Sequence, residues 1–427
     1  MVLQALMFFG LVLIVVGPIH WYLYKRLVKD TTTTKRGRRI GGIAIIALAV
    51  ALLAAFIVPR AVGAKASWVI PLVGYMWLAV LFYLLVTLLV LEIPRVIANR
   101  TWARRPAADR TPATSHDAAT APAGTGSAAS QTMLAEPGLP PAAESPAEVA
   151  GPADPSRRLL IARSAAIFAG LTATGITAYG VKTALGDPVL KRVQIPLAKL
   201  PRSMDGYKIA LVSDIHLGPL TGVEHSRRIV RSINGLSPDL IAVAGDLVDG
   251  TVEELGDEAA PLADLRSRDG AYFVTGNHEY FSGAEEWLVE VDRLGMRPLQ
   301  NERLDIRGLT LAGVNDVSGG DLGEGGPDFA KTLDGRDPGK PVVLLAHQPI
   351  QAFEAAKHGV DLQLSGHTHG GQMVPFNLIA ALQQPVISGL GEVDGTKVYV
   401  TNGAGFWGPP VRVGAPPDIT LVELRAM

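Results

Sequence analysis

The chain contains 427 residues, which is enough for two or three domains and a sizeable core. Cysteine is absent, so disulfides and thiolate ligands are excluded, and a metal ion would have to be held by His, Asp, Asn or Glu. The formal net charge of −1 conceals an asymmetry, because residues 1–198 carry 20 Lys and Arg against 9 Asp and Glu, whereas residues 199–427 carry 19 against 31. The acidic second half would repel a long polyanion, so nucleic acid is not expected as a partner.

Residues 1–100 predict a membrane domain with three transmembrane helices. Apolar runs extend from Leu3 to Tyr24, from Ile40 to Val58 and from Trp68 to Leu91. Each is long enough to cross a hydrocarbon core of about 30 Å. Trp21 and Trp68 stand at the ends of two runs, where interfacial aromatic residues are typical. The alternative, a soluble core of buried helices, would have to hold three such runs.

The next two segments differ sharply in composition. Residues 101–156 are rich in Ala, Pro, Ser, Thr and Gly, which predicts a disordered linker. Residues 157–190 contain a weakly apolar run from Ser164 to Val181, preceded by Arg157 and Arg158, and predict a fourth transmembrane helix or a signal anchor. The arginine pair resembles a twin-arginine export signal, and an ordinary positive flank on a membrane helix is the alternative.

The basic residues of the loops predict the orientation of these helices. The loop between the first two runs holds seven Lys and Arg, and the loop before the third run holds two. The flanks of the linker are basic as well, with Arg104, Arg105, Arg157 and Arg158. The positive-inside rule therefore places the first loop and the linker in the cytoplasm, and with four spans everything after residue 190 lies outside.

Residues 196–427 have the alternation of an α/β domain. A helix from Glu224 to Asn234, closed by Gly235, separates the first two of five short β-rich runs and favours parallel pairing. The runs are Lys208–Val212, Leu240–Ala244, Tyr272–Val274, Val342–Leu345 and Leu362–Leu364.

Every one of these five runs ends in polar residues that can bind metal. The motifs are Asp214-Ile215-His216, Gly245-Asp246, Gly276-Asn277-His278-Glu279, His347, and Gly366-His367-Thr368-His369. Singly, each motif could be a cap or a turn. Together they hold five of the nine histidines, and the carboxyl ends of strands are where α/β sheets build sites. The pattern predicts a centre for divalent cations.

This ordered set resembles the calcineurin-like metallophosphoesterase superfamily, and its membrane-anchored bacterial branch in particular. The resemblance implies two packed β-sheets flanked by helices, in an αββα sandwich, and a multi-pass protein of the bacterial cell membrane. It also implies two divalent ions, which could be Mn, Fe, Zn or Mg. The ligands it implies are Asp214, His216 and His369 on one ion, Asn277, His347 and His367 on the other, and Asp246 between them.

The chemistry of such a set follows from general principles. Two cations about 3.5–4 Å apart can clamp a phosphate and generate a metal-bridging hydroxide that attacks phosphorus. The two oxygens of Asp246 can reach both ions, and Asn277 adds a ligand without adding negative charge. His278 is expected to protonate the leaving oxygen or to stabilise its charge, rather than to bind metal. The predicted activity is hydrolysis of a phosphomonoester or phosphodiester.

Two departures from the usual family pattern, Glu279 and Asn315-Asp316, are expected to leave the ligand set untouched but to alter the pocket. A catalytically silent receptor or scaffold that keeps the fold is the main alternative function, although no ligand is missing from the sequence. A transporter is disfavoured, because the apolar runs contain no Asp or Lys at mid-membrane.

Two apolar stretches, Met373–Leu382 and Phe406–Pro410, follow the last motif. If they edge the pocket, the substrate could be a lipid phosphate, and the domain could contact membrane lipid. Packing in the core is the alternative.

Overall fold

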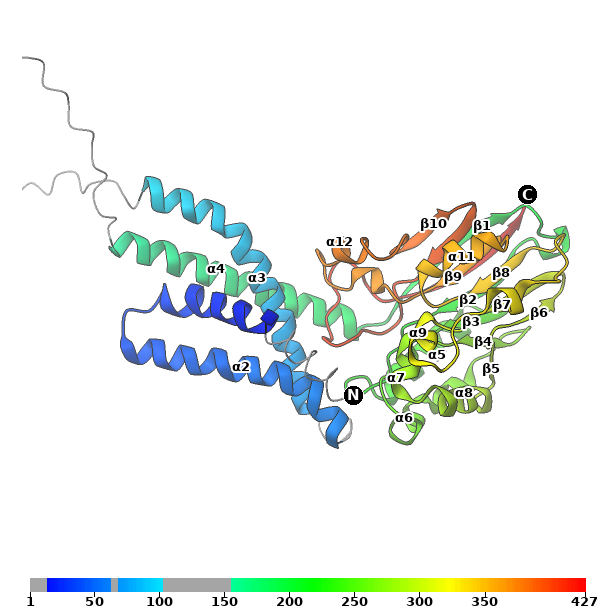
Figure 1. Cartoon of the computed structure of the whole chain (residues 1–427), viewed down its shortest axis with the longest axis horizontal. Helices are drawn as coiled ribbons and strands as arrows, with labels where there is room; N and C mark the ends of the chain where they lie inside the picture. Colours follow the sequence, from blue (N-terminus) through cyan, green and yellow to red (C-terminus); the bar gives the residue numbers. More distant parts are fainter. Residues whose placement is uncertain (1–13, 63–67, 103–154) are drawn as a thin grey trace, which may run out of the picture.

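The computed structural model describes residues 14–62, 68–102 and 155–427, in which a bundle of long helices stands beside an α/β domain (Figure 1). The predicted disordered linker therefore falls almost entirely outside the described residues, as do the first thirteen residues of the chain.

The bundle consists of long apolar helices. Residues 14–23 are helical and continue into a π-helical turn, η1. The labelled segments are η1 (Tyr24–Lys29), α2 (Lys35–Val62), α3 (Val69–Thr101) and α4 (Pro155–Leu185). Within the described ranges, three helical segments have the length and apolar composition to cross a membrane: Lys35–Pro59, Val69–Thr101 and Ser156–Leu185. They contain the predicted second and fourth apolar runs and all of the third except Trp68, whereas the first predicted span, Leu3–Tyr24, lies partly outside the described residues.

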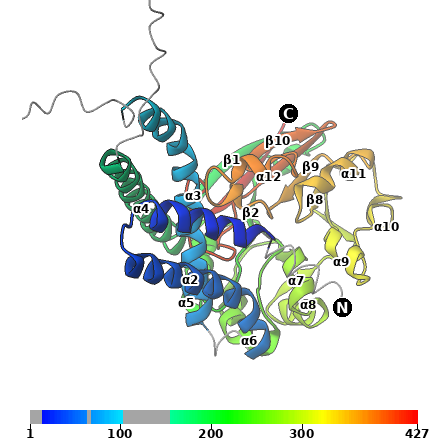
Figure 2. The same ribbon diagram turned by 60° about the vertical axis from the view of Figure 1, so that its left-hand side comes forward.

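The two ends of the bundle differ in what they connect. At one end, Arg163 Nε donates to the carbonyl of Thr31 at 3.1 Å, and Arg157 Nη1 donates to the carbonyl of Trp102 at 3.1 Å. This end therefore gathers the loop before α2 and both flanks of the linker. The other end carries the end of α2, the start of α3 and the exit of α4 into the α/β domain, as both views show (Figures 1 and 2).

The α/β domain contains two six-stranded sheets. The first has the order β1-β12-β2-β3-β4-β5 and the second β10-β11-β9-β8-β7-β6. The strands of the first sheet are β1 (Val189–Leu197), β2 (Tyr207–Val212), β3 (Leu240–Ala244), β4 (Ala271–Val274), β5 (Met296–Pro298) and β12 (Asp418–Ala426). Those of the second are β6 (Glu302–Ile306), β7 (Leu309–Gly313), β8 (Val342–Leu345), β9 (Leu362–Ser365), β10 (Gly389–Val393) and β11 (Thr396–Val400).

Parallel pairing dominates both sheets. Neighbours from β2 to β5 are parallel, as are β7, β8, β9 and β11, while β12 pairs antiparallel with β2. The outer helices are α5 (Val223–Gly235), α6 (Val252–Ala259), α7 (Asn277–Ser282), α8 (Ala284–Arg293), α9 (Val317–Leu322), α10 (Phe329–Leu333), α11 (Ala352–Lys357) and α12 (Asn377–Ala380).

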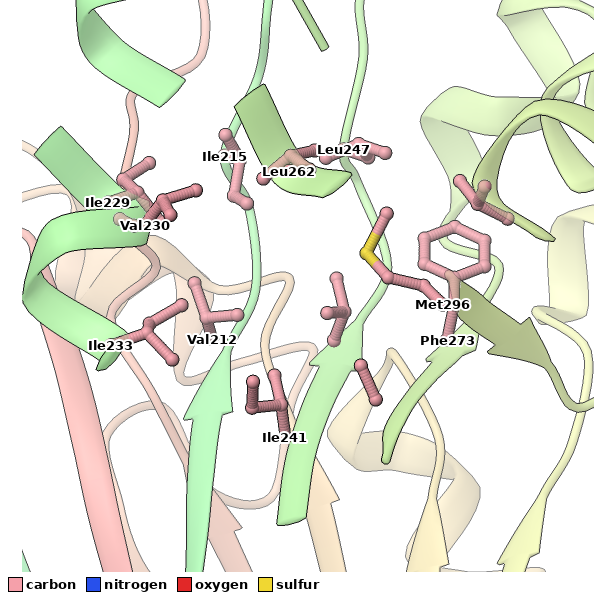
Figure 3. Close-up of a cluster of buried hydrophobic side chains, with 14 of the residues drawn as sticks. Val212, Ile215, Ile229, Val230, Ile233, Ile241, Leu247, Leu262, Phe273 and Met296 are labelled. Carbon is pink, nitrogen blue, oxygen red and sulfur yellow. The ribbon is translucent and has the colours of Figure 1, made fainter. Parts of the chain in front are cut away.

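Both faces of the central strands are buried, which explains their continuous apolar composition. In β2, Ile209 and Leu211 belong to a core that also contains Leu345 and Leu364 of the second sheet. Val212, on the opposite face, packs in a cluster with Ile229 of α5 (Figure 3). The resulting order of layers is helices, sheet, sheet, helices, which confirms the αββα fold. The five predicted strands and the predicted helix are all present.

Candidate metal centre

The predicted site residues lie together where strands of both sheets end. Asp214 and His216 follow β2, Asp246 follows β3, and Asn277 and His278 begin α7 directly after β4. His347 follows β8, and His367 and His369 follow β9. Because β2, β3 and β4 belong to one sheet and β8 and β9 to the other, the centre joins the two sheets at one edge of the sandwich.

Asp214, His216 and His369 form one group of potential ligands, in which one ligand atom from each lies within 4.8 Å of the others. Nε2 of His369 lies 3.4 Å from Oδ1 of Asp214 and 3.1 Å from Nε2 of His216. All three side chains are buried. This is the trio that the family resemblance assigns to the first ion.

Asp246, His347 and His367 form a second group within the same distance limit. Nε2 of His347 lies 3.1 Å from Oδ2 of Asp246, and Nδ1 of His367 lies 3.0 Å from Oδ1 of Asn277. Oδ2 of Asp246 is also 3.8 Å from Nε2 of His216. Asp246 therefore lies between the two groups, as a bridging ligand would.

The backbone at these residues is strained. Asp214, His216, Asp246, His367 and His369 have φ angles between 48° and 70°, in the left-handed region. That conformation costs non-glycine residues roughly 1–3 kcal/mol each. Strain of this kind persists where the surrounding structure fixes side-chain positions for a function, and here it is concentrated on five of the seven predicted ligands.

The unpaired atoms of the site fit divalent cations. His347 donates from Nδ1 to the carbonyl of Ala244 at 2.7 Å, so its Nε2 presents a lone pair. That buried Nε2 lies 3.1 Å from Oδ2 of Asp246, so it carries a proton toward this carboxylate when the ring is charged and offers its lone pair when the ring is neutral. The Nε2 atoms of His216 and His369 share a hydrogen bond at 3.1 Å, which an ion bound between them would replace, and carboxylates complete both groups. Imidazole nitrogens with carboxylate and amide oxygens form a donor set suited to Zn, Mn or Fe.

Buried charges set the pKa values of the histidines. Burial opposes the charge on His347, yet Asp246 and Asp214 raise its pKa well above the ordinary value. Burial and the charge of His347 lower the pKa of His367 to about 3, and burial together with Arg412 lowers the pKa of His369 well below its usual range. Before any cation is bound, His347 therefore favours its charged form, whereas His367 and His369 favour their neutral forms.

His278 borders the centre and faces the adjoining cavity. Its Nδ1 lies 2.6 Å from Oδ1 of Asp249, and its Nε2 lies 4.0 Å from Oδ2 of Asp246. Burial alone would lower the pKa of His278, but these two carboxylates raise it to about 9. His278 also falls within ligand distance of His216 and Asp246, so its position is compatible with an acid role and with a ligand role.

Three supporting residues were missed in the sequence. Asp249 accepts from Nδ1 of His216 at 3.0 Å as well as from His278, so it orients two rings. It lies three residues after Asp246 in the same loop, a spacing that could have drawn attention to it. Glu279 accepts hydrogen bonds from the backbone N–H groups of Gly276, Asp246 and Leu247 at 2.6, 3.0 and 2.7 Å. Glu279 thus holds the loop that carries Asp246, which shapes the pocket without changing which residues are ligands.

Arg412, the third, is fully buried and could not be found from any motif. Its Nη1 donates to the carbonyl of His369 at 2.7 Å, and its Nη2 donates to Nδ1 of His369 at 3.0 Å. Its backbone N–H donates to the carbonyl of Gly180 in α4 at 2.9 Å. Arg412 therefore connects a predicted ligand directly to a helix of the bundle.

A cavity of about 730 Å³ extends from the centre to the bundle. His216, His278 and Asp249 lie at its inner end, and Ala55 and Pro59 of α2 with Pro71 and Tyr75 of α3 form its far wall. Trp407 and Phe281 also line it. The loop of Trp407 is held by Gln372, which exchanges two hydrogen bonds with its backbone at 2.8 and 3.1 Å.

The two predicted apolar stretches divide between core and surface. Met373 and Phe406 are buried, which agrees with core packing. Leu378 and Ile379 are exposed, and Leu382 is 85% exposed. These last three lie on and after α12, and Trp407 is half-exposed on the cavity wall.

Comparison with known proteins assigns a family to this fold. The family model for calcineurin-like phosphoesterases matches residues 207–371. The chain is 39% identical over 292 residues to a transmembrane protein with metallophosphoesterase domain from Bos taurus, which covers 65% of each chain. It thus spans slightly less than two thirds of that relative.

Bacterial relatives are matched over more of their length. An uncharacterized metallophosphoesterase of Helicobacter pylori strain J99 is 38% identical over 272 residues, covering 63% of this chain and 73% of that protein. An uncharacterized metallophosphoesterase of Aquifex aeolicus is 35% identical over 241 residues, which cover 55% of this chain and 91% of that protein. The apolar helices associate the chain with membranes. The domain that matches these relatives makes the chain a member of the calcineurin-like metallophosphoesterase family.

Proposed function

We propose that this protein is a membrane-anchored phosphoesterase that hydrolyses a phosphomonoester or phosphodiester with two divalent ions. The observation that carries the proposal is the convergence of seven side chains from five strand ends on one buried centre. Asp214, His216 and His369 would hold one ion, Asn277, His347 and His367 the other, with Asp246 between them. When bound, the ions would clamp the phosphate and lower the pKa of a water molecule, which supplies the nucleophile.

In this proposal the remaining polar residues prepare the centre. With a pKa of about 9, His278 keeps its proton at neutral pH, and Asp249 occupies its Nδ1. Nε2 is then the ring nitrogen that can protonate a leaving oxygen. Glu279 and Arg412 fix the backbone and ring positions that the ligands require.

The shape of the cavity favours a lipid phosphate as substrate. Its far wall consists of residues from α2 and α3, so one side of the candidate active site is formed by helices that we place in the bilayer. A headgroup at the centre would leave its acyl chains beside Tyr75 and Trp407, where apolar surface is available. The apolar wall is the feature that distinguishes this substrate class from a soluble phosphoester.

The activity is tested with the full chain in detergent micelles. Asp246→Ala is expected to remove both bound metal and hydrolysis, because Asp246 lies between the two ligand groups, 3.1 Å from Nε2 of His347 and 3.8 Å from Nε2 of His216. His278→Ala should keep the metal and slow turnover by roughly 10²- to 10⁴-fold, as loss of a general acid does. Asp257→Ala, a carboxylate remote from the centre on α6, serves as the control for charge.

Metal analysis and product release give the two readouts. Full metal content without turnover of any phosphoester would favour the silent receptor or scaffold instead. Activity that survives a chelator, or the Asp246 variant, would contradict the proposed mechanism.

Substrate class is measured by comparing phosphatidic acid in mixed micelles with glycerol phosphate. The lipid is expected to be turned over faster, because its chains contact the cavity wall that the headgroup alone does not reach. Equal turnover of the two would favour a soluble substrate and would leave the apolar loops as packing elements.

A further inference from the structure

The end of the bundle remote from the α/β domain contains a second cavity, of about 650 Å³. It is enclosed by η1, the loop before α2, and the ends of α2, α3 and α4. Six of its lining residues are basic and one is acidic: Lys25, Arg26, Lys29, Arg38, Arg95, Arg158 and Asp30. The phosphoesterase centre lies at the other end of the bundle, so this cavity is a separate site.

The charges of this basic cavity are arranged in two layers. At its floor, Arg26 pairs with Asp30 at 2.9 Å and with Glu92 at 2.7 Å, and Arg95 pairs with Glu92 at 2.5 Å. The floor is therefore close to neutral. At the rim, Lys25, Lys29 and Arg158 have no ion pair within the described part of the chain, so their charges are available to an anion.

A narrow slot continues from the floor between α3 and α4. It shares Arg26, Asp30, Arg95 and Ala162 with the basic cavity, and Leu88, Leu91, Ala165 and Ala166 also line it. Its volume of about 10 Å³ is too small for a hydrocarbon chain. Beyond the cavity, α3 and α4 expose Leu89, Ile93 and Leu160. The cationic cavity is therefore bordered by apolar surface, a combination that matches a molecule with an anionic head and hydrocarbon tails.

We propose that this cavity binds the phosphate headgroup of an anionic phospholipid whose hydrocarbon chains lie in the bilayer against exposed apolar side chains of α3 and α4, such as Leu89, Ile93 and Leu160. Basic pockets between membrane helices recognise phosphate headgroups by charge, and arginine offers paired donors to phosphate oxygens. Phosphatidylglycerol is a suitable probe, because it carries a single phosphodiester charge. The site would anchor the bundle in the leaflet opposite the phosphoesterase centre.

The test uses the full chain in phosphatidylcholine nanodiscs that contain a small fraction of phosphatidylglycerol, with retained lipid counted by native mass spectrometry. The pocket variant replaces Lys25, Lys29 and Arg158 by Gln. Each cation near an anionic lipid strengthens binding roughly fivefold, so the triple variant should retain phosphatidylglycerol on the order of 100-fold more weakly. A charge-preserving variant, Lys25→Arg with Lys29→Arg and Arg158→Lys, should bind as the unmutated protein does.

The matched control replaces Lys35, Arg36 and Arg39 by Gln, which removes the same charge from the same end of the bundle but outside the cavity. This control should retain phosphatidylglycerol. Equal losses in both triple variants would show that the lipid responds only to general surface charge, and the proposal would fail.

Inorganic phosphate distinguishes a lipid headgroup from a soluble anion. If phosphate alone binds in detergent and depends on the same three residues, while phosphatidylglycerol is not retained, the lipid assignment is overturned. Gel filtration of each variant monitors folding, and the charge-preserving variant keeps the test decisive if the Gln triple aggregates.

Discussion

At the scale of single residues, the pair of Asp249 and His278 makes the pH dependence of the proposed reaction testable. The acid role requires protonated His278, and its pKa is raised to about 9 by Asp246 and Asp249 against the effect of burial. The protonated form therefore prevails below that pH and is lost above it. We expect kcat/KM to fall as pH rises through about 9.

Asp249→Asn provides the control for this assignment. Without the carboxylate at 2.6 Å from Nδ1, the pKa of His278 should move down toward its ordinary value. The alkaline limb of the kcat/KM profile, where activity falls with rising pH, should move to lower pH with it. His278→Asn should abolish the limb. A limb that is unchanged in both variants would assign the titration to another group and would weaken the acid role.

At the scale of elements, α4 and the loop that carries Arg412 are packed too closely for a side chain at Gly180. A Cβ atom there would meet Val411 Cγ1 at 2.5 Å and Val413 Cγ2 at 2.8 Å. Gly180→Leu should therefore displace Arg412 and loosen His369, although the mutation is in a membrane helix. Loss of such a supporting contact typically weakens metal binding about 10- to 100-fold.

Gly175→Leu is the matched control on the same helix, because a Cβ atom at Gly175 meets nothing within 4 Å. Metal affinity, measured by competition with a chelator, should be unchanged in this variant. Arg412→Met should reproduce the effect of Gly180→Leu, since it removes the donors to His369 directly. If Gly180→Leu binds metal normally, the bundle and the centre are not coupled.

The elements also show which features could be predicted from the sequence. Each predicted ligand directly follows an apolar β-run, so strand ends and motifs located Asp214, Asp246 and His347 together. Arg412 gave no such signal, because it lies 43 residues from His369 in an irregular loop and acts only through the folded chain. The division into two sheets was likewise beyond the pattern of single strands, since it depends on which buried faces pack together, and it came from the family resemblance.

At the scale of the whole molecule, the two ends of the bundle predict opposite locations for the linker and the α/β domain. At the basic end, a hydrogen bond between Trp102 and Arg157 joins the two flanks of the linker. At the other end, the chain passes from α4 into β1 of the α/β domain. The positive-inside rule places the basic end in the cytoplasm, so we propose that the α/β domain is extracytoplasmic. In spheroplasts of cells producing the full chain, external protease should digest the α/β domain and spare an epitope tag inserted in residues 103–154.

The arginine pair adds a second arm to this experiment. Arg157 also lies over the ring of Trp102 at 5.4 Å from the centroid, as an ordinary flank of a helix bundle can, so a structural role competes with the export signal. Replacing Arg157 and Arg158 by Lys preserves the charges of the basic cavity, but twin-arginine export would fail and leave the α/β domain protected. If the Lys pair is digested as readily as the unmutated protein, the pair is a positive flank. If the unmutated α/β domain is protected while the tag is cleaved, the bundle has the opposite orientation.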